Sequence, residues 1–115
     1  MTNIQRIESG SRMSQAVIHG DTVYLSGQVG TLGESIGVQV RSALAEVDRL
    51  LAQAGTNKSR ILAATIWLAD MGDFAAMNAE WEAWVDPANP PARATGQASL
   101  ADPGYRFEVI VTAAR

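Results

Sequence analysis

Only two stretches of this sequence have the periodicity of a helix, and they lie among stretches with the composition of strands. Residues 38–54 carry apolar side chains at helical spacing and stop before Gly55, a common helix terminator. Residues 74–85 form the second expected helix, with Asp70 and Asp73 at its start, where acidic groups complement the helix dipole. Two helices cannot cover both faces of a large sheet, and this limits the possible folds.

Six stretches are expected to be strands. Gly20-Asp21 suits a tight hairpin turn, Gly30, Gly33 and Gly37 predict a loop, and the β-branched run 60–68 has the apolarity of a central strand. The expected order is β-β-β-α-β-α-β-β, an α+β fold in one domain spanning residues 1–115. The strands are expected at residues 3–8, 14–19, 22–27, 60–68, 92–99 and 105–113.

One face of this sheet is expected to lack a cover within the chain. Right-handed crossovers between parallel strands place both helices on the same face. The strands remain apolar on their other side, and no further helix is available to bury it. We therefore expect the chain to form an oligomer, in which another copy covers the second face.

Composition excludes several classes of partner. The net charge is −3, and the nine cationic residues are scattered, so we expect no nucleic-acid partner. No apolar run approaches the roughly 20 residues that span a bilayer, and the N-terminus lacks the apolar core of a signal peptide, which predicts a cytoplasmic protein without a membrane partner. With no cysteine and a single histidine, His19, we expect no metal.

Arg93 is the first candidate for chemistry. A guanidinium matches a carboxylate at two points, and Pro90-Pro91 stiffens the chain that leads to it. The alternative is an arginine that pairs with an acid of a neighbouring subunit, and local chemistry alone favours that alternative.

Glu108 is the second candidate, because it interrupts an otherwise apolar strand. Alternation turns it away from Phe107, Val109 and Val111. We expect partial desolvation to raise its pKa towards neutrality, which suits a group that gives and takes protons. A half-buried glutamate that fixes strand register is an equal alternative.

Ser26-Gly27-Gln28 is the third candidate. Gly27 would allow a ligand to approach the backbone closely. Ser26 lacks the Gly-x-Ser-x-Gly context of a hydrolase nucleophile, so a serine hydrolase is not expected.

Together these residues resemble the RidA (YjgF-type) family of reactive-intermediate enamine and imine deaminases. The family's motifs follow in order over nearly the whole chain: Ser14-Gln15-Ala16-Val17, Leu25-Ser26-Gly27-Gln28, Met77-Asn78-Ala79-Glu80-Trp81, Pro91-Ala92-Arg93 and Phe107-Glu108-Val109.

The resemblance implies a chorismate-mutase-like mixed β-sheet with two α-helices on one face, in which the last strand inserts between earlier ones. It also implies a homotrimer with active sites in the clefts between subunits. By this resemblance Arg93 grips the substrate carboxylate and Glu108 positions water or handles protons. Gly27 and Asn78 line the cleft, and Thr95 replaces a cysteine whose backbone contacts the ligand.

Met13 marks a departure from the family. Many members carry a tyrosine there that reaches into the pocket, whereas the thioether of Met13 makes no useful hydrogen bond. The loop after Gln28 is also shorter. Both changes indicate an atypical branch of the family.

The activity implied by the resemblance is hydrolysis of a 2-imino acid, or its enamine tautomer, to a 2-keto acid and ammonia, as in 2-iminobutanoate/2-iminopropanoate deaminases. Neither metal nor organic cofactor is implied, because an imine is already electrophilic. The alternative is a non-catalytic module that binds small keto acids or related metabolites. Arg93 would serve either function, and Glu108 distinguishes them.

Overall fold

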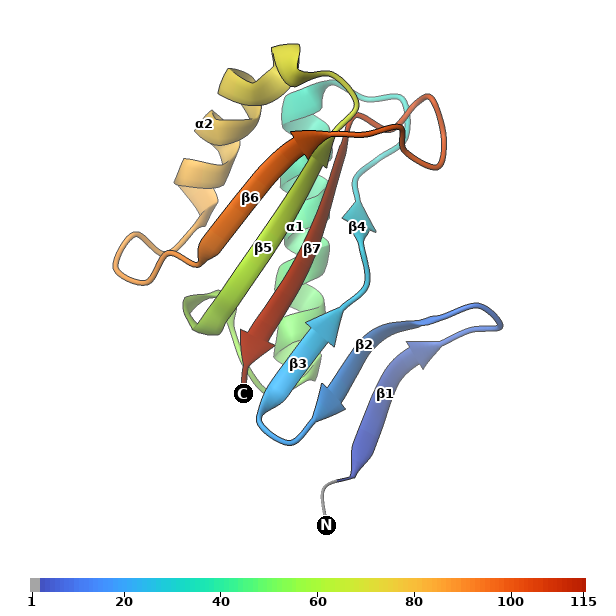
Figure 1. The fold of residues 1–115 in the computed structure, drawn as a ribbon, viewed down its shortest axis with the longest axis vertical. Helices are drawn as coiled ribbons and strands as arrows, with labels where there is room; N and C mark the ends of the chain where they lie inside the picture. Colours follow the sequence, from blue (N-terminus) through green and yellow to red (C-terminus); the bar gives the residue numbers. More distant parts are fainter. Residues whose placement is uncertain (1–2) are drawn as a thin grey trace.

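The computed structural model describes residues 3–115, which form a single mixed sheet with two long helices (Figure 1). The strand order is β1-β2-β3-β7-β5-β6, and the short β4 pairs with β7 beyond the end of β3. The strands are β1 Ile4–Ser9, β2 Ser14–His19, β3 Thr22–Leu25, β4 Gln28–Val29, β5 Ile61–Leu68, β6 Ala92–Gln97 and β7 Phe107–Ala114. The helices are α1 Ile36–Gln53 and α2 Phe74–Trp84, with 3₁₀ turns η1 Lys58–Arg60 and η2 Met71–Asp73.

The last strand inserts into the middle of the sheet, as the resemblance implied. β7 pairs antiparallel with β3 on one side and with β5 on the other. β3 and β5 therefore run in the same direction, although they are not neighbours. β5 and β6 pair in parallel, since α2 carries the chain back between them, and the predicted central position of β5 is confirmed.

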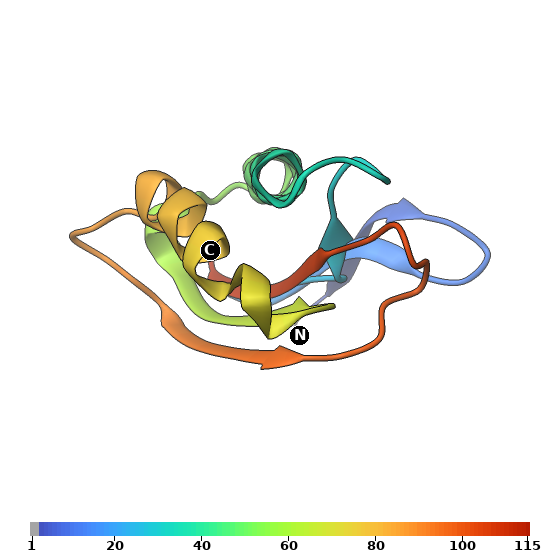
Figure 2. The same ribbon diagram turned by 90° about the horizontal axis from the view of Figure 1, so that it is seen from above.

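Both helices lie on one face of the sheet (Figure 2). Alternation along β7 turns Phe107, Val109 and Val111 into the core, where the apolar face of α1 meets them. Glu108 and Ile110 point to the opposite face, which no element of residues 3–115 covers. The predicted asymmetry of the sheet is confirmed.

Several expected boundaries were wrong. α1 begins at Ile36, so Gly37 lies inside the helix and not in the preceding loop. β6 ends at Gln97 and β7 starts at Phe107, which leaves a longer connection between them than expected. The capping expectation also needs correction, because Asp70 caps the 3₁₀ turn η2 while Asp73 bonds to Arg106.

Candidate active site

A break between β3 and β4 creates the first part of the candidate site. Tyr24 pairs with Thr112, whereas Gln28 pairs with Val109. Between these two pairs the β3–β4 segment advances by four residues, while β7 advances by only three. The extra residue makes a β-bulge at residues 26–27. The expected strand over 22–27 therefore ends at Leu25, because the ladder to β7 is interrupted there.

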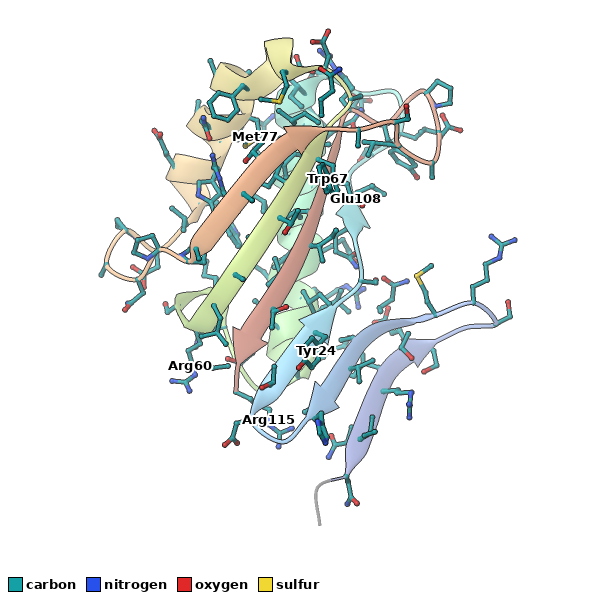
Figure 3. All side chains as sticks on the ribbon, viewed as in Figure 1. Tyr24, Arg60, Trp67, Met77, Glu108 and Arg115 are labelled. Carbon is teal, nitrogen blue, oxygen red and sulfur yellow. The ribbon has the colours of Figure 1, made fainter. Side chains whose placement is uncertain are left out.

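Gly27 lies directly against the carboxyl group of Glu108. A β-carbon at Gly27 would stand 2.9 Å from both Cδ and Oε2 of Glu108. On its other side Glu108 is paired with Trp67 of β5, and the two side chains lie next to each other on the open face (Figure 3). Glu108 is half-buried, and the bulge and Trp67 together confine its carboxylate.

Arg93 lies on the other face of the sheet. It pairs with Ala64, a core residue, and in a parallel pair such neighbours point to the same side. Its guanidinium carbon stands 5.3 Å from the centroid of the Trp81 ring on α2. Burial lowers the pKa of Arg93, while the charge of Glu82 acts in the opposite direction.

No ion pair of Arg93 is found among residues 3–115. Arg41, Arg49 and Arg106 each lie within ion-pair distance of a carboxylate of this chain. Arg93 is half-buried and rests on an aromatic ring, with the charge of Glu82 nearby but no ion pair to it, so its N–H donors are left for an external acceptor.

Two further predicted residues lie on the side of Arg93. Asn78 is half-buried on α2, one turn before Trp81, and hence on the same face of that helix. Thr95 follows Arg93 at strand spacing and pairs with Ile66 of the core. Its hydroxyl oxygen is buried and has no hydrogen-bond partner within residues 3–115.

Met13 lies apart from both groups. It is 55% exposed at the turn between β1 and β2. Together with Arg12 and Gln15 it lines a shallow hollow of this hairpin.

Five of the six predicted site residues therefore form two separate half-sites within one chain, and Met13 belongs to neither. Gly27 and Glu108 meet on the open side of the sheet, whereas Arg93, Thr95 and Asn78 belong to the helix side at the outer edge. The full width of β5 lies between β6 and β7, so Arg93 and Glu108 do not meet inside one chain.

Sequence reasoning missed the partner of Arg93. Trp81 was noted only as part of a helical motif, yet it supplies the surface on which the guanidinium rests. The signal was a tryptophan three residues after Asn78, on the helix face that carries a predicted site residue.

Within residues 3–115, no group of three or more His, Cys, Asp or Glu side chains is placed to hold a metal ion. None of the helices in this part of the chain is long and apolar enough to cross a membrane.

Comparison with known proteins decides the family. The family model described as Endoribonuclease L-PSP, which is the YjgF or RidA family, matches residues 3–115. The chain belongs to this family. Among solved structures, the YjgF family member NMB1025 from Neisseria meningitidis superimposes with a TM-score of 0.96 at 42% identity, covering 98% of this chain and 95% of that one.

Some relatives within the YjgF family are named for an activity, and others only for their family. A RutC family protein from Haemophilus influenzae is 45% identical over 112 residues, covering 96% of this chain and 97% of the relative. The 2-iminobutanoate/2-iminopropanoate deaminase of Rattus norvegicus is 31% identical over 103 residues, covering 84% of this chain and 74% of that enzyme. This member is thus closer to RutC family proteins than to the named deaminases.

Proposed function

We propose that the protein hydrolyses reactive 2-imino or enamine acids to 2-keto acids and ammonia, in a cleft between subunits of a homotrimer. The observation that carries the proposal is Arg93, a half-buried guanidinium with no carboxylate partner among residues 3–115. A 2-imino acid brings the carboxylate that this guanidinium lacks. The deaminase names of more distant relatives support the same chemistry.

The separation of the two half-sites supports the oligomer. Arg93 sits at the outer edge of the sheet, and Glu108 lies on the uncovered face, so a second copy must bring its Arg93 towards Glu108 of the first. The open face carries apolar side chains that favour such contact, among them Tyr24, which is 49% exposed.

The reaction needs few groups. Arg93 holds the substrate carboxylate, and Glu108 orients a water molecule against the imine carbon and accepts one of its protons. The new C–O bond forms as the C=N π electrons move to nitrogen, which takes up a proton from solvent. The carbinolamine then collapses: its hydroxyl proton leaves to solvent, the keto C=O bond forms, the C–N bond breaks, and ammonia departs with the proton that Glu108 returns.

The test measures ammonia released from freshly generated 2-iminobutanoate or 2-iminopropanoate. Wild-type protein should accelerate release over the uncatalysed reaction, and Arg93→Ala should lose that acceleration. An equal rate with and without wild-type protein would contradict the proposed activity.

Glu108→Gln separates the enzyme from the binding module. An amide keeps the size of the side chain but cannot accept the proton, so turnover should fall at least a hundredfold while 2-keto acid affinity stays within a few fold. If the wild-type protein binds the keto acid but releases no ammonia from the imino acid, it is a binding module.

A further inference from the structure

Three polar side chains, those of Gln15, Ser26 and Gln28, form a hydrogen-bonded cluster at the bulge that contains Gly27. Ser26 Oγ donates to Gln15 Oε1 over 2.9 Å, and Gln28 Nε2 donates to the same oxygen over 3.0 Å. Gln28 Nε2 also lies 3.1 Å from the main-chain oxygen of Ser26. Gln28 is 6% exposed, so this network is largely shielded from water.

The network fixes the orientation of the Gln15 amide. The Ser26 carbonyl oxygen only accepts hydrogen bonds, so the atom of Gln28 that faces it must be the amide nitrogen. That nitrogen only donates, and hence the atom of Gln15 opposite it must be the carbonyl oxygen. The Gln15 nitrogen is therefore turned away from the network.

The Gln15 nitrogen has two N–H donors and forms no hydrogen bond with another group of residues 3–115. Gln15 is half-buried and lines the hairpin hollow, about 360 Å³ in volume, together with Arg12 and Met13. The amide is thus held in one orientation by buried partners on one side while its donors stay free on the other.

The same network includes Ser26, the residue that precedes Gly27. Gln15 bonds to Ser26, and the next residue, Gly27, touches the Glu108 carboxyl group. Gln15 and Glu108 therefore lie on either side of residues 26–27, the segment that carries the bulge. A fixed pair of N–H donors one strand away from this carboxylate suits a ligand that carries oxygen acceptors.

We propose that Gln15 is a substrate-binding residue that donates a hydrogen bond from its amide nitrogen to an oxygen atom of the bound acid. This inference rests on the proposed function for the identity of the ligand, a 2-imino acid or its keto acid product. Ser26 and Gln28 act as positioning residues, since they hold the amide in the donating orientation.

Two variants test the role of Gln15. Gln15→Glu keeps an oxygen for Ser26 and Gln28 but replaces the free N–H₂ by a second carboxylate oxygen, which repels an acid. Gln28→Glu replaces the donor by an acceptor, so the Gln15 amide must turn round and present its carbonyl outward. Gln5→Glu is the matched control, because Gln5 is exposed on β1 of the same hairpin and receives the same charge.

The measurement is the affinity of the full-length protein for 2-oxobutanoate, by calorimetric titration, with the fold checked by thermal unfolding. Gln15→Glu and Gln28→Glu should each weaken binding about tenfold or more, the scale of a hydrogen bond to a charged group. Gln5→Glu should bind like the wild type. If Gln28→Glu does not fold, Gln15→Glu alone decides.

Equal affinities of Gln15→Glu and Gln5→Glu would overturn the proposal, as would a wild-type protein that does not bind 2-oxobutanoate. Weakened binding by Gln15→Glu in a protein that releases no ammonia would uphold it and reject the proposed activity. A crystal with bound 2-oxobutanoate gives the direct check, an oxygen of the acid within about 3.2 Å of Gln15 Nε2.

Discussion

Replacing Gly27 by alanine adds one methyl group at the point where the backbone touches Glu108. The new carbon would stand 2.9 Å from Cδ and Oε2, whereas ordinary van der Waals contacts lie at 3.4–4 Å, so the carboxylate must move by at least 0.5 Å. A misplacement of 1 Å costs about a hundredfold in rate. We therefore expect kcat for ammonia release to fall about tenfold to a hundredfold.

Stability should change little in the same variant. The φ angle of Gly27 lies outside the left-handed region, so alanine fits its backbone conformation. The atoms that must yield belong to the end of a flexible side chain, and the free energy of unfolding should stay within about 1 kcal/mol of the wild type. Urea unfolding and steady-state kinetics on the same preparation separate the two effects.

Gly37→Ala is the control for Gly27→Ala. It adds the same methyl group on α1, 3.3 Å from Nη1 of Arg41 and 3.4 Å from Oε1 of Glu80, two flexible side chains that pair with each other, and it does not touch Glu108. Its kcat should match the wild type, and stability should rise by about 0.5–1 kcal/mol, because glycine weakens a helix. A fully active Gly27→Ala would refute the argument that this contact fixes Glu108.

Three other perturbations have defined outcomes. Gln39→Leu removes three hydrogen bonds of a fully buried amide, so urea unfolding should report a loss of about 3 kcal/mol. Trp81→Leu takes away the ring beneath Arg93 and should raise KM about fivefold to thirtyfold with little change in kcat, whereas Trp81→Phe should retain part of the effect. The Arg49 guanidinium holds the pKa of Glu8 below its ordinary 4.5, so ionised Glu8 stabilises the protein above that pH and the contribution disappears as pH falls. Glu8→Gln should thus lower stability at pH 7 and flatten its decline in acid, measured by urea unfolding at each pH.

Local patterns in the sequence were sufficient for most elements of the fold. Period-two alternation placed Glu108 opposite Phe107 and Val109, and helical spacing located both helices to within two residues at each end. These patterns can be read locally, because whether a side chain is buried or exposed follows from its position along its own strand or helix.

Non-local features had no such signal. The insertion of β7 between β3 and β5 came from the family resemblance, since nothing in residues 105–113 specifies which strands they pair with. The bulge at residues 26–27 depends on register against β7, and the stacking of Arg93 on Trp81 depends on how α2 lies over β6. The roles expected for the site residues remain predictions.

The division of Arg93 and Glu108 between opposite faces has a genetic consequence. Each active centre would take Arg93 from one chain and Glu108 from another. A chain with a defective Arg93 could then still supply a working Glu108 to a second centre. Two inactive proteins, Arg93→Ala and Glu108→Gln, should then restore activity when they are unfolded, mixed in equal amounts and refolded together.

Random assortment would give about a quarter of the centres both working residues, and so about a quarter of wild-type activity. Each variant refolded alone should stay inactive. In a cell that carries both alleles, the activity lost through either mutation would then depend on the other allele as well.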